Sequence, residues 1–555
     1  MRILIVLLSL LLGLLGPSDE TAVTEDYYYN GVVSSADRLA SEVGIKILQE
    51  GGNAIDAAVG VGFALAVVYP QAGNIGGGGF MVIRLADGTA TSIDFREKAP
   101  LLATRNMYLD INGNVIENLS TIGHLAAGVP GSVAGLLYAL EKYGTMSRQQ
   151  VMKYAIELAE NGFVVSEHLA DAIRNYNTDF KKFEGSYKIF KNVKANQPFF
   201  QKDLASTLKA IRDYGRDGFY KGKVADLIVN EMKGGNGIIS YKDLEDYNVI
   251  EREVLRGTYR GYDIITMRPP SSGGICLLEF LNILEYYNLS SITQTEYVHL
   301  LTEVMKRVYA DRAEFMGDDD FVNVPVDILT SKVYAKRRME SFNENKASTS
   351  VEIKPGDAYY KESINTTHYS VADKYGNVVA TTTTLNDNFG CKVVVDGAGF
   401  LLNNEMDDFA IKPNYPNIYG LIGSEANSIA PGKRMLSSMT PTIVLKDNKP
   451  FLVLGSPGGG KIITAVLQTI VHIIDFNRTL SDAIEIRRFH HQWLPDYIQY
   501  EQGCFPKTVV SQLMSMGHNL KEVSNFGRID AIMIFPDGRM TGHSDSRGYG
   551  KALGY

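Results

Sequence analysis

The sequence has few of the residues that build disulfide frameworks or metal clusters. It contains three cysteines, at positions 276, 391 and 504, and none of them lies in a Cys-x-x-Cys pair. An odd number of widely separated cysteines predicts neither a disulfide framework nor a zinc site, so we expect small buried hydrophobic residues instead. The chain also has no G-x-S-x-G motif, which argues against the nucleophile elbow of the α/β-hydrolases.

Charge of one sign is also scarce. A net charge of −8 is spread over 555 residues, so we expect no nucleic-acid partner. A hydrophobic content of 45% and a charged content of 21% are typical of a globular protein with a large core. The length exceeds the usual range of a single domain.

Long hydrophobic runs are few, and one of them stands at the start of the chain. Arg2 precedes an apolar run over residues 3–16, which ends at Pro17. A membrane-spanning helix needs about 20 residues, so this run predicts a signal peptide over residues 1–18. We therefore expect an exported protein, periplasmic or extracellular, with no membrane partner once the leader is removed. Because no clear small-residue cleavage site follows, an uncleaved leader that anchors the chain is the alternative.

Helical and strand patterns alternate along the rest of the chain. Apolar periodicity predicts helices over residues 36–50, 54–68, 146–159, 204–214, 297–315 and 462–474. Strand and turn signals predict strands over residues 80–84, 91–95, 369–372, 378–385, 393–395, 400–402, 442–445, 451–455 and 532–535. Strands in hairpins beside helices favour antiparallel sheets covered by helices. The polar residues 336–363 are expected to form a mobile segment.

That polar segment leads to Asn365 and Thr366, and we interpret the bond between them as a place where the chain cuts itself. A new N-terminus at Thr366 would carry a hydroxyl and a free α-amine on one residue. An α-amine titrates near pH ~8, so it can take the hydroxyl proton and activate the nucleophile. Taken alone, Asn-Thr-Thr also fits the plain start of a β-strand.

Three glycines, Gly458 to Gly460, follow one predicted strand and open a predicted helix. The first backbone N–H groups of a helix lack intrahelical acceptors, so they could stabilise the oxyanion of an acyl intermediate. Residues 455–461 also match the start of a phosphate-binding loop. However, Ile462 stands where that motif needs Ser or Thr, which argues against nucleotide binding.

Many motifs in fixed order resemble one family. TTHYSV, TLNDNFG, LLNNEMDDF, KRMLSSMTPTIV and GSPGG resemble the small subunit of the γ-glutamyltransferases, which are N-terminal nucleophile hydrolases. Upstream, GGNAIDAAV, GNIGGGGF, DFREKAP, GVPGSVAG and RPPSSGGI resemble the large subunit of that family. The resemblance implies an α+β fold, a four-layer αββα sandwich formed jointly by a large subunit (19–365) and a small catalytic subunit (366–555) after self-cleavage.

The resemblance also assigns roles to individual residues. Thr366 is the nucleophile and, with Asn365, the cleavage site; Thr384 hydrogen-bonds the nucleophile, and Gly458 and Gly459 form the oxyanion hole. The α-carboxylate of the substrate is held by Arg96, Ser437 and Ser438, and its ammonium group by Asn386, Glu405 and Asp408. Tyr419, in a predicted lid loop over residues 411–424, closes over the glutamyl group.

Without the resemblance, several of these residues have plainer interpretations. Arg96 beside Glu97 would form a surface salt bridge, which contributes little. The serine pair would be a turn or cap, residues 405–408 a solvated acidic face or a metal site, and residues 411–424 a polar surface loop.

The implied function is transfer of the glutamyl group of glutathione or other γ-glutamyl amides to water or to acceptor amino acids and dipeptides. No metal or organic cofactor is implied. Two alternatives remain, namely a related acylase acting on amides such as cephalosporin side chains, and an unprocessed protein that binds γ-glutamyl compounds. The complete glutamyl clamp argues against the first, and the retained Thr366 and Thr384 against the second.

Overall fold

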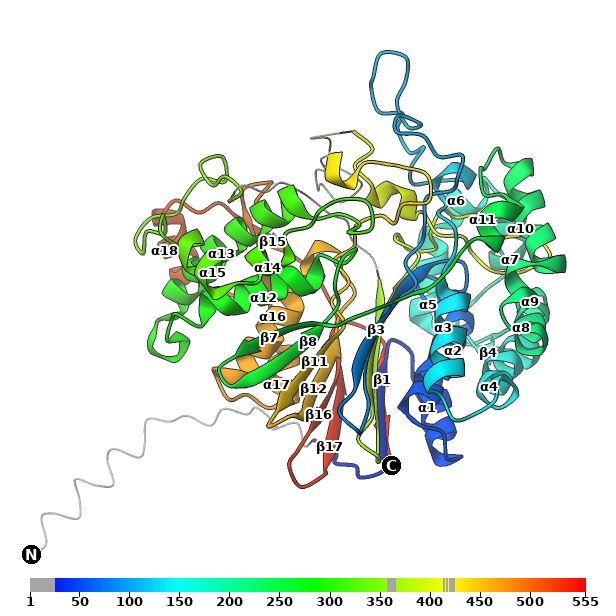
Figure 1. The fold of residues 1–555 in the computed structure, drawn as a ribbon, viewed down its shortest axis with the longest axis horizontal. Helices are drawn as coiled ribbons and strands as arrows, with labels where there is room; N and C mark the ends of the chain where they lie inside the picture. Colours follow the sequence, from blue (N-terminus) through cyan, green and yellow to red (C-terminus); the bar gives the residue numbers. More distant parts are fainter. Residues whose placement is uncertain (1–24, 357–365, 413–414, 416–417, 419–424) are drawn as a thin grey trace, which may run out of the picture.

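The structure is a computed structural model that describes residues 25–356, 366–412, 415, 418 and 425–555. Two antiparallel sheets lie face to face in its centre, with helices on both outer sides (Figure 1). Strands of the two sheets contact each other directly, β12 with β9 and β10, and β16 with β9. The arrangement is therefore a four-layer αββα sandwich.

The seven-stranded sheet has the order β18–β1–β9–β10–β2–β3–β6, with every neighbouring pair antiparallel. In that order its strands are Lys551–Gly554, Gly31–Ser35, Thr367–Asp373, Val378–Thr384, Gly78–Arg84, Ala90–Asp94 and Ile250–Arg252.

The six-stranded sheet has the order β17–β16–β12–β11–β8–β7 and is also antiparallel throughout. In that order its strands are Met540–Ser544, Asp530–Ile534, Lys449–Gly455, Thr442–Lys446, Tyr262–Thr266 and Leu255–Tyr259. Each sheet thus combines strands that precede Thr366 with strands that follow it.

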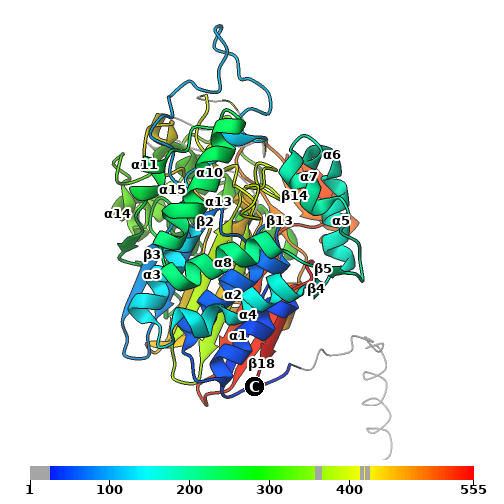
Figure 2. The same cartoon turned by 90° about the vertical axis from the view of Figure 1, so that its right-hand side faces the viewer.

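Helices cover the two outer faces. The seven-stranded sheet is covered by a group that faces the viewer in Figure 2 and comprises α1 (Arg38–Gln49), α2 (Ala54–Val68), α3 (Ser132–Tyr143), α4 (Arg148–Asn161) and α8 (Lys202–Tyr214). The six-stranded sheet is covered by α12 (Gly273–Leu284), α13 (Gln294–Phe315), α16 (Gly460–Ile474) and α17 (Leu480–Glu485) (Figure 1).

Further elements surround these layers. The helices are α5 (Glu167–Asn175), α6 (Asn177–Phe180), α7 (Glu184–Phe190), α9 (Asp217–Tyr220), α10 (Gly222–Gly234), α11 (Tyr241–Glu245), α14 (Val326–Leu329), α15 (Lys332–Arg338) and α18 (Lys507–Ser515). The strands are β4 (Phe163–Val164), β5 (Pro198–Phe199), β13 (Phe489–His490), β14 (Ile498–Glu501) and β15 (Leu520–Val523).

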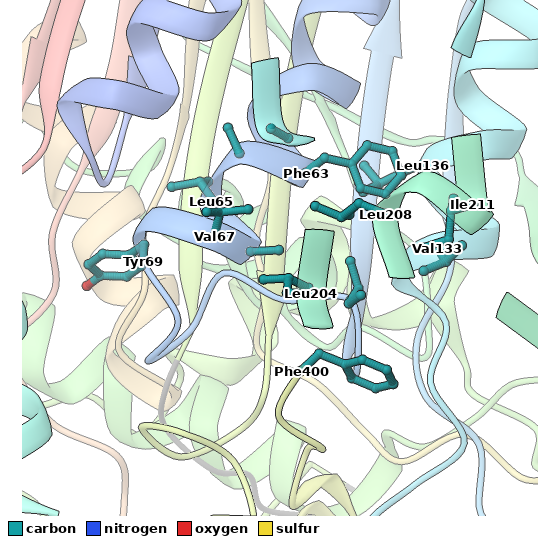
Figure 3. Close-up of a cluster of buried hydrophobic side chains, with 14 of the residues drawn as sticks. Phe63, Leu65, Val67, Tyr69, Val133, Leu136, Leu204, Leu208, Ile211 and Phe400 are labelled. Atoms are coloured by element: carbon teal, nitrogen blue, oxygen red, sulfur yellow. The ribbon is translucent and has the colours of Figure 1, made fainter. Parts of the chain in front are cut away.

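Helix α2 is the central helix of the first group, and all of its residues are buried. Its apolar sequence predicted this, because a helix that is hydrophobic on all sides belongs in a core. A capping box between Asn53 and Asp56 fixes its start. Figure 3 shows how the α2 side chains pack with those of α3 and α8; the labelled residues are Phe63, Leu65, Val67, Tyr69, Val133, Leu136, Leu204, Leu208, Ile211 and Phe400.

Every predicted helix is present, with ends that differ by no more than about three residues. Most of the predicted strands are present as well. The exception is the pair over residues 393–395 and 400–402, which forms only the isolated bridge between Val394 and Leu401. Cys276 and Cys391 are buried and Cys504 is half-buried, and all three are free thiols.

The prediction of a mobile segment over residues 336–363 is wrong as far as Gly356. The segment starts within α15, and buried carboxylates then bind its backbone. Ser348 N–H donates to Glu303 at 3.1 Å and Gly356 N–H donates to Asp311 at 2.7 Å. Residues 357–363 lie outside the described residues, as do the predicted signal peptide, Asn365 and Tyr419. No helix among the described residues is long and apolar enough to cross a membrane.

Candidate active site

Thr366 lies directly before β9, in the middle of the seven-stranded sheet. Its exposed fraction is 7%. Thr367 pairs with Thr383 of β10, so the antiparallel register places Thr384 beside Thr366. The Thr384 hydroxyl accepts a hydrogen bond from the N–H of Asn386 at 2.7 Å. The ends of two central strands therefore bring three predicted site residues together.

A small cavity of about 10 Å³ lies in front of Thr366. Apart from Met439 and Ile462, all of its lining residues were predicted as site residues from motifs far apart in the sequence. The lining consists of Arg96, Thr366, Thr384, Asn386, Glu405, Asp408, Ser437, Ser438, Met439 and Ile462.

Arg96 follows the end of β3 and is fully buried. Its guanidinium forms ion pairs with Glu405 and Asp408, which lie on the short helix η3 (Glu405–Asp408). It also donates to the carbonyl oxygens of Met435 at 3.2 Å and Leu436 at 3.0 Å. The cavity is small because these groups, which could bind an amino acid, are paired with one another.

Glu97 lies beneath this cluster. Its exposed fraction is 0%, so the interpretation of Arg96 and Glu97 as a surface pair is wrong. Burial raises the pKa of the Glu97 carboxyl to about 8, although Arg96 opposes the shift. Burial and the nearby Glu97 also raise the pKa of Glu405 well above its usual range. A buried group of three carboxyls and one guanidinium has room for another positive charge, such as an ammonium group.

Ser437 and Ser438 lie in an extended segment fixed by the residues of the RPPSSGG motif. Ser437 N–H donates to the carbonyl of Pro270 at 2.9 Å, and Ser272 N–H donates to the carbonyl of Ser437 at 2.7 Å. Gly273 packs so closely that an added Cβ would lie 2.2 Å from the hydroxyl of Thr440. A segment before Thr366 thus holds the serine pair in place.

Gly458 and Gly459 are not among the residues that line the cavity. They lie at the start of α16 with φ angles of 131° and 60°, values that favour glycine. Ile462 connects them to the cavity, because it lines the cavity and its N–H donates to the carbonyl of Gly459 at 2.8 Å. The glycine pair is therefore one helical turn from the predicted nucleophile's cavity.

His368 is the titratable residue nearest to Thr366 in sequence, but it is a structural residue. Its Nδ1 is 2.8 Å from the hydroxyl of Thr382 and its Nε2 is 3.0 Å from that of Ser370. Burial, together with the charge of Arg528, lowers the pKa of His368 to about 3. With both ring nitrogens engaged in the core, His368 is poorly suited to serve as a base for Thr366.

Two groups among the described residues have the spacing of metal ligands. One comprises Asp318, Asp319 and Asp320, and the other His299, Glu303 and His518. In the second group the carboxylate of Glu303 is bound by Lys306 at 3.1 Å and Arg307 at 2.8 Å. These two cations already neutralise the negative charge of Glu303, which a metal ion would need as a ligand. Neither of the two groups of possible ligands lines the cavity in front of Thr366.

Most of the predicted lid loop lies outside the described residues, but Ile418, within the loop, contacts the acidic residues that precede it. Ile418 N–H donates to the carboxylate of Asp407 at 3.2 Å, and the Ser120 hydroxyl donates to its other oxygen at 2.6 Å. Burial raises the pKa of Asp407 to about 7. The position of Tyr419 remains a prediction.

Comparison with known proteins identifies the family. A family model described as Gamma-glutamyltranspeptidase matches residues 40–555. The chain belongs to the gamma-glutamyltranspeptidase family. It is 47% identical over 543 residues to a protein named glutathione hydrolase proenzyme from Escherichia coli (strain K12), covering 96% of this chain and 93% of that protein.

Solved structures agree with this assignment. The crystal structure of Helicobacter pylori gamma-glutamyltranspeptidase shares 51% sequence identity and a TM-score of 0.57, covering 58% of this chain and 95% of that chain. A cephalosporin acylase from Bacillus halodurans has a TM-score of 0.86 with 24% identity, covering 98% of this chain and 99% of that chain. At that identity the likeness shows the fold alone, and the predicted α+β sandwich is confirmed.

Sequence reasoning missed several residues at the gamma-glutamyltranspeptidase cavity. Met439 and Ile462 line it, and both are apolar. Met439 lies within the KRMLSSMTPTIV motif and Ile462 just after the glycine pair, and only the serines and the glycines of these stretches were assigned roles. Glu97 was set aside because adjacent opposite charges are usually exposed. Arg312, a buried arginine behind the serine pair, lies in a long helical pattern and had no sequence signal that set it apart.

Proposed function

We propose that this chain is a self-processing γ-glutamyltransferase and glutathione hydrolase with Thr366 as its nucleophile. One observation carries the proposal. A single cavity brings the hydroxyl-bearing Thr366 together with a buried arginine and two buried carboxyls, Glu405 and Asp408. An arginine fits a carboxylate and a carboxylate pair fits an ammonium group, so the cavity suits the head group of a free amino acid.

Maturation begins at the bond between Asn365 and Thr366. The Thr366 hydroxyl attacks the carbonyl carbon of Asn365, the C–N bond breaks, and an ester to Thr366 forms. Water then hydrolyses the ester, which leaves a carboxylate on Asn365 and a free α-amine on Thr366. The amine supplies the base that the hydroxyl otherwise lacks.

Substrate binding replaces ion pairs inside the cluster. The α-carboxylate of the γ-glutamyl group binds Arg96, Ser437 and Ser438, and its ammonium group binds Glu405, Asp408 and Asn386. Arg96 exchanges a carboxylate of the protein for the α-carboxylate of the substrate, and the two acidic residues exchange the guanidinium for the ammonium group. Every buried charge therefore keeps a partner of opposite sign. A compound lacking either charge would leave a buried group unpaired, which is costly.

The reaction then proceeds by acyl transfer. The Thr366 hydroxyl attacks the γ-glutamyl carbonyl carbon while its amine takes the proton. Backbone N–H groups of Gly458 and Gly459 stabilise the oxyanion, and the hydroxyl of Thr384 forms a hydrogen bond with the nucleophile. The leaving amine departs with the proton, and water or the amine of an amino acid or dipeptide resolves the ester.

The proposal extends to assembly and location. The chains 19–365 and 366–555 stay together as a heterodimer, since in both sheets strands before Thr366 pair directly with strands after it. The apolar run over residues 3–16 supports export through a signal peptide over residues 1–18.

Two anilide substrates test the proposal. γ-Glutamyl-p-nitroanilide should be cleaved, faster with glycylglycine as acceptor, and Thr366→Ala should abolish cleavage. Glutaryl-p-nitroanilide, which lacks the α-amine, should be turned over at least ~100-fold more slowly because the buried carboxyls lose their ammonium partner. Equal rates for both anilides would support the acylase alternative, and binding without turnover would support the binding-protein alternative.

A further inference from the structure

A second buried arginine lies behind the site serines. Arg312 belongs to α13, and its exposed fraction is 1%. Its Nε donates to the hydroxyl of Ser272 at 2.9 Å, and its Nη2 donates to the hydroxyl of Ser438 at 3.4 Å. The Ser272 hydroxyl in turn donates to the carbonyl of Ser437 at 2.7 Å. Arg312 therefore reaches both residues of the serine pair, one directly and one through Ser272.

The direction of these hydrogen bonds is fixed by chemistry. A guanidinium has donors only, so the Ser438 hydroxyl oxygen must be the acceptor in its bond with Arg312. The Ser437 hydroxyl accepts in the same way from the N–H of Met439, at 3.2 Å. In each of these bonds the serine hydroxyl is the acceptor, so its own proton remains available for a further hydrogen bond. Both serines are thereby set to donate to another group.

The group placed to receive these protons is an anion in the cavity. Ser437 and Ser438 line the same cavity as Arg96. Two hydroxyl donors beside a guanidinium form a suitable site for a carboxylate. If the Arg312 donor were absent, the Ser438 hydroxyl could rotate and offer its lone pairs to the cavity instead.

We propose that Arg312 is a positioning residue that sets the Ser438 hydroxyl as a donor to the α-carboxylate of the substrate. Arg312 acts through Ser438 and Ser272 and does not touch the substrate. The identity of the carboxylate rests on the proposed function.

The same helix offers a matched control. Arg307 is also 1% exposed on α13, and donates to the carbonyl of Arg338 at 2.9 Å and to Glu303 at 2.8 Å. Among the described residues, none of its hydrogen-bond partners lines the cavity. Arg307→Lys therefore removes a buried guanidinium from α13 without changing the serine pair.

The test is a double-mutant cycle with γ-glutamyl-p-nitroanilide, using Arg312→Lys, Ser438→Ala and both together. A hydrogen bond to a charged group contributes ~1.5–3 kcal/mol, so Arg312→Lys should raise KM at least ~10-fold while kcat changes less than ~3-fold. In the Ser438→Ala background the same change should alter KM less than ~2-fold. Arg307→Lys should lower Tm and leave KM unchanged.

Product inhibition gives a second readout. Arg312→Lys should weaken inhibition by L-glutamate and leave inhibition by 4-aminobutyrate, which has no α-carboxylate, unchanged. The inference is overturned if the KM effects of Arg312→Lys and Ser438→Ala multiply independently, or if both inhibitors weaken equally. If Arg312→Lys does not mature, Arg312→Gln replaces it in the cycle, because it also removes the guanidinium donor to Ser438, with the same coupling to Ser438 expected.

The two proposals fail in different ways. An inactive wild-type protein would overturn the proposed function. A wild-type protein that is active, whose KM rises in Ser438→Ala but not in Arg312→Lys, would overturn this inference alone.

Discussion

Arg96 holds the polar groups of the cavity together through its planar fork. It pairs with Glu405 and Asp408 on one side and donates to the carbonyl oxygens of Met435 and Leu436 on the other. The charges of the carboxyls outweigh burial and hold the pKa of the guanidinium above its ordinary value. The residue therefore stays charged whether or not a substrate is bound.

Arg96→Lys should lower kcat/KM for γ-glutamyl-p-nitroanilide by about 100-fold. A lysine keeps the charge but cannot bind two carboxyls and two carbonyls at once, and a buried charged pair that loses a partner costs 2–5 kcal/mol. Arg38→Lys, on the exposed pair with Glu42, is the control and should change nothing. An Arg96→Lys enzyme with wild-type kcat/KM would contradict the proposed role.

The buried carboxyl of Asp407 should make the stability of the protein depend on pH. Burial raises its pKa to about 7 from an ordinary value of 3.8. The folded state therefore keeps a proton that the unfolded state loses, so the stability from this group is complete below pH ~4 and is lost as pH rises towards 7.

Asp407→Asn removes this titration. The Tm of the variant relative to the wild type should therefore rise by several degrees between pH 4.5 and 7.5, as measured by thermal unfolding in matched buffers. Asp226→Asn, at an exposed position, should run parallel to the wild type. If the Tm of Asp407→Asn also ran parallel to that of the wild type across this pH range, the claim that burial raises the pKa of Asp407 would be wrong.

At the scale of elements, the turn before β2 determines where β10 ends. Gly77 lies in this turn, and an added Cβ would lie 2.0 Å from the carbonyl oxygen of Thr384 and 2.7 Å from the side chain of Asn74. Because this oxygen belongs to the backbone, it can move away from the added Cβ only if the end of β10 moves as well. Thr384 at that strand end is a predicted site residue beside Thr366.

Gly77→Ala should therefore impair maturation or reduce kcat at least ~10-fold, and it should also lower Tm. Gly234→Ala is the control, because a Cβ at the end of α10 meets nothing within 4 Å. Kinetics and thermal unfolding of both variants check the prediction. A Gly77→Ala enzyme that matures and turns over normally would show that the turn does not control the position of Thr384.

The elements that the sequence predicted are those with local signals. The helix over residues 54–68 is predicted with its correct ends, because its apolar run and its Asn53 cap are both local. Strands β1 and β18 were missed, because β1 is short and its partners, β9 and β18, lie far away in the sequence. Short strands are stabilised by neighbours that single-sequence patterns do not reveal.

The contrast between local signals and distant contacts also explains which site residues were predicted and which were missed. The roles assigned to Arg96, Glu405 and Asp408 came from family resemblance, and the structure brings these residues to one cavity. Composition alone could not show that Glu97 is buried beneath them, or that α13 places Arg312 behind Ser438. Both facts depend on packing between segments more than 100 residues apart.

At the scale of the whole molecule, strands from both sides of Thr366 are interleaved. β1 pairs with β9 and β18, and β2 pairs with β10, so each of these contacts joins the region before Thr366 to the region after it. The six-stranded sheet does the same where β8 pairs with β11. Cleavage at residue 366 would cut none of these backbone hydrogen bonds.

We therefore expect the two cleaved chains to separate only when the protein unfolds. Mature protein and uncleaved Thr366→Ala should elute at the same volume from a sizing column. In a urea titration, loss of circular dichroism and separation of the chains should coincide. Dissociation into two folded chains without denaturant would contradict the shared-sheet architecture.

The central claim is that Thr366 is both the cleavage point and the nucleophile. Intact mass and N-terminal sequencing of purified wild type beside Thr366→Ala test it directly. The account predicts two chains in the wild type, one of them beginning at Thr366, and a single uncut chain in the variant. A folded wild-type protein that remains one chain, or a variant that is cut at the same bond, would contradict it.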